Sequence, residues 1–258
     1  MEASFDKAAT NYDTTFTHSV IGKLQRNRVY FHVSKKLNSV KTLLEINCGT
    51  GEDAIWLAQK NIVVTATDIS SQMIEIGKSK SNLNNLNFIQ TDINEIKNQF
   101  SNEKFDLIFS NFGGLNCLSK SELTQFFNSS QYLLSDNGKL ALVIMPKNTL
   151  WEQLFFVMKL DFKNAFRRRK KNAIANVDGK KVTTYYYNPE DILTLSSHDF
   201  KILETKPIGF FVPPSYLESF FHNKPKLISF LNTLEKKITH QSWLSKYADH
   251  YLIILEKK

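Results

Sequence analysis

The sequence predicts an α/β protein with a mainly parallel sheet covered by helices on both faces. Between residues 42 and 145, short apolar runs rich in Val, Ile and Leu alternate with amphipathic segments, as in sheets whose strands are joined by helices. The chain has 258 residues, of which 42% are hydrophobic, enough for one compact domain with a sizeable core.

The expected elements follow one another in a regular order until Pro146 stops the fifth strand. The expected strands cover residues 42–47, 62–68, 87–90, 105–110, 139–145, 182–187, 201–212 and 250–255. The expected helices cover residues 53–59, 71–80, 122–134 and 228–238, with Ser70 or Ser71 as an N-cap. Residues 1–40 are polar at first and then amphipathic. Residues 150–180 are expected to be helical and then loop-like, and turns are expected at 136–138 and 178–179.

Composition excludes several classes of protein. The longest apolar runs, such as Leu140–Met145, are too short to span a bilayer, and the first residues carry no signal peptide pattern. Cys48 and Cys117 cannot form a disulfide framework, so we expect a reducing, cytoplasmic location. The net charge of +8 is concentrated between Lys159 and Lys181, where nine Lys and Arg face two Asp. This indicates a local basic patch rather than a basic protein.

Acidic residues follow three successive predicted strands. Glu45 precedes a turn that contains Gly49 and Gly51, Asp68 ends the second strand, and Asp92 follows the third. Ligands of open α/β sheets bind at the carboxyl ends of the strands. A carboxylate at Asp68 can accept from both hydroxyls of a ribose, and one at Asp92 from an adenine amino group. Glu45 is placed to position an ammonium group, so the sequence predicts a nucleoside site.

A dinucleotide is the direct competitor for this site. The Gly-x-Gly pattern is followed by Ala54, which a dinucleotide fingerprint tolerates. However, Glu52 and Asp53 put two negative charges at the N-terminus of the next helix, where a pyrophosphate would bind. S-adenosylmethionine (SAM) has no phosphate, so these charges favour SAM over NAD.

With these motifs in place, the chain resembles class I SAM-dependent methyltransferases, which have a seven-stranded Rossmann-like sheet. The resemblance covers residues 1–145, and the C-terminal strands by topology only. Its motifs are Leu44–Gly51, Thr67–Ser70, Gln72–Met73, Thr91–Ile93 and Phe105–Asn111. In the family the first turn position is usually Gly, whereas here it is Asn47, the next residue most tolerant of a left-handed backbone.

The resemblance implies a role for each matching residue. Asp68 would hold the ribose, Ile69 and Met73 would flank the adenine, and Asp92 with the backbone of Ile93 would bind its amino group. Ser110 and Asn111 would lie under the sulfonium and the acceptor. Phe5–Ala9 and Asn11–Asp13 resemble a segment that closes over SAM, so that Tyr12 would contact the methionine moiety and Arg28 its carboxylate. The expected cofactor-binding set is therefore Tyr12, Arg28, Glu45, Asn47, Gly49, Gly51, Asp68, Ile69, Met73, Asp92, Ile93, Ser110 and Asn111.

The acceptor side is less defined. Phe112 and Asn116, beside two glycines after the fourth strand, are expected to face the acceptor, as are the aromatic residues Trp151 and Tyr186. His18 is the candidate general base, although a lone His is more often a surface or core residue. No Asn-Pro-Pro-Tyr motif follows the fourth strand and no spaced metal-ligand set is present.

These observations predict a methyltransferase that acts on a small-molecule biosynthetic intermediate. The acceptor atom would be O, N or C, and the acceptor molecule could be apolar or bound to a carrier. A nucleic-acid methyltransferase and a non-catalytic SAM-binding protein remain alternatives. Within one compact domain we expect a helical lid (1–40), the SAM-binding core (41–146), a substrate-specific insertion (147–200) and a closing segment (201–258). The basic run of Arg167, Arg168, Arg169, Lys170 and Lys171 would be a solvated face, or would meet an acidic partner or membrane surface.

Overall fold

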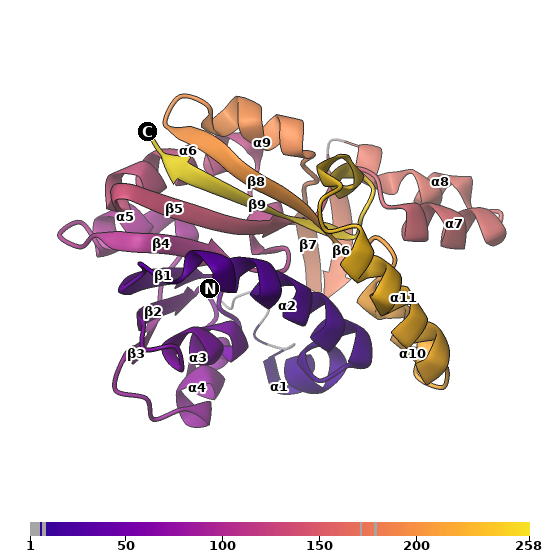
Figure 1. Ribbon diagram of the computed structural model, residues 1–258, viewed down its shortest axis with the longest axis horizontal. Helices are drawn as coiled ribbons and strands as arrows, with labels where there is room; N and C mark the ends of the chain where they lie inside the picture. The colour runs from indigo at the N-terminus through magenta and orange to yellow at the C-terminus, as the bar shows by residue number, and fades with distance from the viewer. Residues whose placement is uncertain (1–5, 7–8, 171, 178–179) are drawn as a thin grey trace.

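The computed structural model describes residues 6, 9–170, 172–177 and 180–258. Its centre is a seven-stranded sheet in the order β3-β2-β1-β4-β5-β9-β8 (Figure 1). The first five strands are parallel, and β9 runs antiparallel to both of its neighbours. The strands are β1 (Thr42–Ile46), β2 (Val63–Asp68), β3 (Leu86–Gln90), β4 (Phe105–Ser110), β5 (Leu134–Ile144), β8 (Phe200–Ile208) and β9 (His250–Lys257). The predicted Rossmann-like α/β fold is confirmed.

Helices cover both faces of this sheet. The α-helices of the described residues are α1 (Ala9–Tyr12), α2 (Val20–Val33), α3 (Glu52–Ala58), α4 (Ser71–Lys80), α5 (Ile96–Gln99), α6 (Lys120–Leu133), α7 (Leu150–Met158), α8 (Phe162–Ala165), α9 (Pro189–Ser196), α10 (Glu218–Phe221) and α11 (Pro225–Lys237). In the part of the chain that the structure describes, no helix combines the length and the apolar character needed to cross a bilayer.

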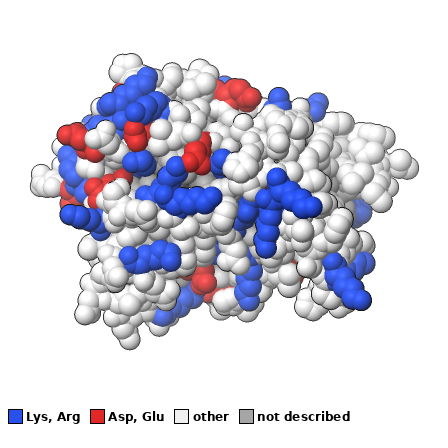
Figure 2. Space-filling view, in the orientation of Figure 1, with Lys and Arg blue, Asp and Glu red and all other residues white. Residues whose placement is uncertain are grey.

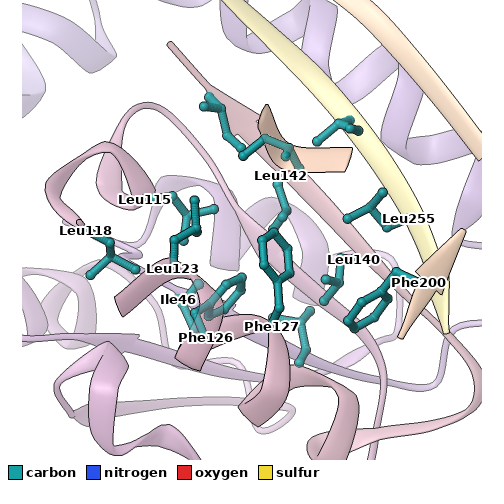
Figure 3. Packing of buried hydrophobic residues seen from close by; sticks show 14 of the residues in the cluster. Ile46, Leu115, Leu118, Leu123, Phe126, Phe127, Leu140, Leu142, Phe200 and Leu255 are labelled. Carbon is teal, nitrogen blue, oxygen red and sulfur yellow. The ribbon is translucent and has the colours of Figure 1, made fainter. Parts of the chain in front are cut away.

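Alternate residues of each central strand enter two different cores, because successive strand side chains point to opposite faces. Leu44 and Ile108 belong to the core under α6 and α9, which also contains Phe126 and Phe127 (Figure 3). Their neighbours Leu43 and Leu107 belong to the core under α2, α3 and α4. Burial on both faces explains why the strands read as continuous apolar runs.

The segments inserted after β5 lie outside the seven-stranded sheet, beyond the ends of its strands (Figure 1). Strands β6 (Ala173–Val177) and β7 (Lys180–Thr184) form a separate antiparallel hairpin. Helices α7 and α8 project from the body of the molecule beyond this hairpin, with α10 and α11 below them (Figure 1). A small apolar cluster of Ile21, Val212, Phe221 and Ile228 joins α2 to α10 and α11.

Three expectations about the elements need correction. Helix α9 was not predicted, although Asn188 with Asp191 forms a capping box and Pro189 occupies its first turn. Strand β6 was not predicted either. Strand β5 begins at Leu134, so the turn expected at 136–138 is an irregular part of the strand, with Asn137 at φ 58°. The turn expected at 178–179 lies outside the described residues.

Candidate functional site

A cavity of about 410 Å³ lies along the carboxyl ends of β1, β2 and β4 and the segment that follows β3. Ten of the predicted cofactor and acceptor residues line it, namely Tyr12, Asn47, Gly49, Asp68, Ile69, Met73, Asp92, Ile93, Asn111 and Phe112. Residues far apart in the sequence thus meet at one edge of the sheet, as strand-end positions of a parallel sheet should. Which ligand atom each of them contacts stays a prediction.

Asp68 is held in place by the backbone. One of its carboxylate oxygens accepts from the N–H of Gly49 at 2.9 Å, and the other accepts from the N–H of Ser70 at 2.9 Å. Burial raises the pKa of Asp68, while these backbone hydrogen bonds act in the opposite direction. Each oxygen keeps a further lone pair for a hydroxyl donor from the cavity.

Apolar side chains line the walls next to Asp68. Met73 is buried and Ile69 is half exposed on one wall, and Ile93 lies on the segment after β3. Beside Ile93, the Asp92 carboxylate uses one oxygen to accept from the N–H of Asn94 at 2.8 Å. This combination suits a planar base that carries an amino group.

The turn after β1 has a left-handed backbone at Asn47 (φ 56°) and Gly49 (φ 54°). The Asn47 amide donates to the Ser110 hydroxyl at 3.3 Å. A Cβ added at Gly114 would meet the Asn47 side chain at 2.3 to 2.5 Å. Gly114 therefore makes room for the side chain of Asn47.

Sequence reasoning missed a buried polar network on the cavity wall. Arg26 forms an ion pair with Asp53 at 2.8 Å, and both residues line the cavity. Asp53 also accepts from the Tyr30 hydroxyl at 2.7 Å and from the Asn111 amide at 3.1 Å. Burial alone would lower the pKa of Arg26, but Asp53, Tyr30 and Tyr12 together outweigh it and raise that pKa.

Arg28 does not reach the cavity. This corrects the expectation that Arg28 would bind the carboxylate of SAM's methionine moiety. Its guanidinium donates to the Thr239 hydroxyl and, at 3.4 Å, to the carbonyl oxygens of Glu235 and Lys236 at the end of α11. Side chains two positions apart on an α-helix point in directions that differ by about 200°. Arg26, and not Arg28, therefore points to the site.

Three other predicted cofactor residues lie beneath the cavity rather than in its wall. Glu45 is fully buried, burial raises its pKa, and one of its oxygens has no hydrogen-bond partner among the described residues. Gly51 leaves space for the Phe88 ring, which a Cβ would meet at 2.5 Å. Ser110 is buried and accepts from Asn47. These residues support the floor of the cavity.

Most acceptor-side expectations are wrong about placement. The Asn116 side chain donates to the carbonyl oxygens of Met145 and Tyr185 and accepts from the Met145 N–H, so it joins chain segments. Trp151 donates to the Phe210 carbonyl. Tyr186 packs against Arg168, and His18 is exposed; neither residue lines the cavity.

Phe112 lines the cavity, as expected for a residue that faces the acceptor. Other segments form the rest of this acceptor end of the cavity. Phe112 has a left-handed backbone (φ 43°) and lines the cavity. Met145, at the end of β5, and Val182 and Thr184, from β7, also line it. The segment expected to determine the substrate, residues 147–200, therefore contributes through its hairpin.

The basic run after α8 is largely engaged within the protein. Arg167 and Arg168 pair with the buried Glu152 at 2.6 and 2.9 Å, and Arg168 also pairs with Asp249 at 3.2 Å. Arg169 donates to the Asn148 side chain at 2.8 Å. Lys170 is exposed, and Lys171 lies outside the described residues. The predicted partner surface is therefore not one continuous patch of available cations.

No group of His, Cys, Asp and Glu suited to a metal ion occurs among the described residues. Cys48 and Cys117 are both free thiols. The cavity therefore offers carboxylates, an arginine, amides and apolar walls as its chemical groups.

Comparison with known proteins agrees with this geometry. The family described as "Methyltransferase domain" matches residues 43–138. A malonyl-[acyl-carrier protein] O-methyltransferase of Priestia megaterium is 30% identical over 151 residues, 54% of this chain and 51% of that protein. A demethylmenaquinone methyltransferase of Clavibacter sepedonicus is 27% identical over 114 residues, 44% of this chain and 46% of that protein. The chain thus spans about half the length of these curated relatives.

Two solved structures share the fold over most of the chain. An S-adenosylmethionine-dependent methyltransferase of Clostridium acetobutylicum has a TM-score of 0.63 at 15% identity, covering 98% of this chain and 99% of its own. The magnesium protoporphyrin IX methyltransferase of Synechocystis PCC 6803, with bound SAH, has a TM-score of 0.56 at 15% identity, covering 92% of this chain and 83% of its own. At such identities the likeness is one of fold.

Proposed function

We propose that this chain, of which residues 43–138 match the methyltransferase-domain family, is a class I SAM-dependent methyltransferase that transfers the methyl group of SAM to a small-molecule acceptor. The observation that carries the proposal is the position of Asp68. Two backbone N–H groups fix its carboxylate at the end of β2, inside a cavity with apolar walls. Relatives that act on malonyl-[acyl-carrier protein] and on demethylmenaquinone support a non-nucleic-acid acceptor.

The cavity fits SAM better than a dinucleotide. Glu52 and Asp53 lie in the first turn of α3 and both line the cavity, so a pyrophosphate at that helix N-terminus would face their carboxylates. In our proposal Asp68 binds the ribose, Ile69, Met73 and Ile93 enclose the adenine, and Asp92 accepts from its amino group. Arg26 remains within reach of the methionine carboxylate, because the ion pair with Asp53 uses one end of its guanidinium.

Methyl transfer is an in-line displacement at a cationic sulfonium, which supplies an electrophile when SAM is bound. The protein then needs to align the acceptor and exclude water, and alignment alone accounts for much of the rate. Phe112, Met145 and Val182 give the acceptor end an apolar surface for this purpose.

We further propose an acceptor atom that is already deprotonated at neutral pH. The described residues that line the cavity include no histidine, and burial raises the pKa of Tyr12 to about 12. Of the five carboxylates in the lining, those of Asp53, Asp68, Asp92 and Glu122 already accept hydrogen bonds within the protein. A tyrosine with that pKa stays protonated at neutral pH and is a poor general base. A carboxylate or an acidic enol meets this condition without a base.

Calorimetry with SAM tests the proposal. Asp68→Ala should abolish measurable SAM binding, whereas the control Glu190→Ala, at an exposed helix position, should bind like the parent. Unchanged SAM affinity in Asp68→Ala would contradict the assignment of the site. A nucleic-acid acceptor would instead be indicated by RNA or DNA binding that falls steeply with salt.

A further inference from the structure

Helices α7 and α8 form a projecting arm whose tip is apolar and exposed. Met158 at the end of α7, Leu160 in the turn between the helices and Phe162 at the start of α8 are 76%, 79% and 58% exposed. The arm stands away from the body of the molecule in Figure 1 and is mostly white in Figure 2. Large apolar side chains gathered at one protruding point normally mark an interaction site.

Positive charges surround this tip. Lys159 lies within it, Lys163 follows Phe162, and Arg169 and Lys170 come at the base of the arm, all of them exposed. Of the two acidic residues of the arm, Glu152 is buried against Arg167 and Arg168. Asp161 lies in the tip and is only partly buried, and its carboxylate accepts from the N–H and the side-chain amide of Asn164 at the start of α8. Four cations (Lys159, Lys163, Arg169 and Lys170) against one partly exposed carboxylate leave an excess of positive charge beside the apolar groups.

The arm is anchored firmly to the protein at its base. Besides the pairs of Glu152, the Phe155 ring packs against Tyr216 with centroids 5.8 Å apart, and Trp151 packs against Phe221. The turn at the tip is closed by backbone hydrogen bonds, although Leu160 has a left-handed φ of 57°. A leucine in that conformation and 79% exposed has no role in the core.

The arm is also linked to the cavity. The chain continues from α8 through Arg167–Arg169 into the hairpin of β6 and β7, and Val182 and Thr184 of β7 line the cavity. A surface that binds the tip is thus connected to the acceptor end of the cavity through about twenty residues of chain.

We propose that the tip of this arm docks on an anionic lipid surface. Apolar side chains at a convex tip enter the interface between headgroups and acyl chains, and flanking cations are attracted to anionic headgroups. A second copy of the chain is a poorer occupant, because pairing two identical tips would bring Lys159 and Lys163 against their own counterparts. This inference does not depend on the identity of the methyl acceptor.

Vesicle co-sedimentation of the full chain tests the proposal, with phosphatidylcholine vesicles and with vesicles that also contain phosphatidylglycerol. The parent should bind the anionic vesicles, less so as salt rises, and the neutral ones weakly. Leu160→Glu and Phe162→Glu should each weaken binding by about tenfold, because each places a negative charge in the interface. Lys159→Glu with Lys163→Glu should do the same.

The control is Leu193→Glu, since Leu193 is 44% exposed on α9 at another part of the molecule; it should bind vesicles like the parent. All variants should keep the parent's circular dichroism spectrum and SAM affinity, because their side chains lie outside the cavity. The proposal is overturned if the parent does not bind anionic vesicles at low salt, or if Leu160→Glu binds equally well. It is also overturned if the variants dissociate a dimer seen by light scattering, which would make a second copy the occupant.

Discussion

The two ends of the cavity are built in different ways. The end that contains Asp68 and Asp92 is formed by the loops that directly follow β1, β2 and β3, and backbone N–H groups hold the Asp68 carboxylate. The end that contains Phe112, Met145 and Val182 is assembled from the loop after β4, the end of β5 and an inserted hairpin. The first end is thus fixed by the sheet itself, whereas the second depends on how inserted segments pack. This difference fits a constant methyl donor and a variable acceptor.

The ion pair of Arg26 and Asp53 should give the largest effect, because it supports the wall shared by both ends. Arg26→Met leaves the Asp53 carboxylate buried without its cation, which should lower the free energy of unfolding by about 3–5 kcal/mol. Urea unfolding measures this loss, and calorimetry should show weaker SAM binding as well. Arg28→Met is the matched control, since Arg28 points to α11 and should leave SAM affinity unchanged. Equal loss of SAM affinity in both variants would contradict the placement of Arg26.

The buried cluster of Glu152, Arg168 and Asp249 should matter next, because it anchors the segments of the acceptor end. Burial alone would raise the pKa of Asp249, but His250 and Arg168 outweigh it and hold that pKa well below its usual range. Asp249→Asn should cost about 2 kcal/mol at neutral pH, less than a fully unpaired charge because Glu152 still balances Arg168.

The pH dependence of that difference has a definite sign. A carboxyl group whose pKa is depressed on folding stabilises the folded state above its unfolded pKa, and the contribution disappears as pH falls. The difference in stability between the parent and Asp249→Asn should therefore begin to shrink as pH falls below about 4, the unfolded pKa of an aspartate, and vanish only near the much lower folded pKa. A constant difference between pH 7 and pH 3, followed by denaturant unfolding, would show that Asp249 does not act through its charge.

The contact between Asn47 and Gly114 should give the smallest effect, since it concerns one methyl group. Gly114→Ala should cost about 1 kcal/mol, because the added Cβ would overlap the Asn47 side chain, which can shift in part. The double variant Gly114→Ala with Asn47→Gly should recover most of that loss in thermal unfolding. Additive losses in the double variant would mean that the two side chains do not share space.

The sequence allowed most of the first end to be predicted and little of the second. Asp68 ends a strand that the sequence predicts, and Asp92 follows another. The alternation of strands and helices puts such positions together at the carboxyl ends of the strands. Asn116 could not be placed in this way, because its partners Met145 and Tyr185 lie 29 and 69 residues away. Arg26 and Arg28 are equally plausible from the sequence, and only the packing of α2 decides which one faces the cavity.

The most direct measurement is an experimental structure of the chain with S-adenosylhomocysteine. Our account predicts the ribose hydroxyls within hydrogen-bonding distance of Asp68, the adenine between Met73 and Ile93, and the methionine carboxylate facing Arg26. The sulfur should point towards Phe112, Met145 and Val182. A ligand bound elsewhere, or one whose sulfur faces away from these residues, would contradict the division of the cavity into a donor end and an acceptor end.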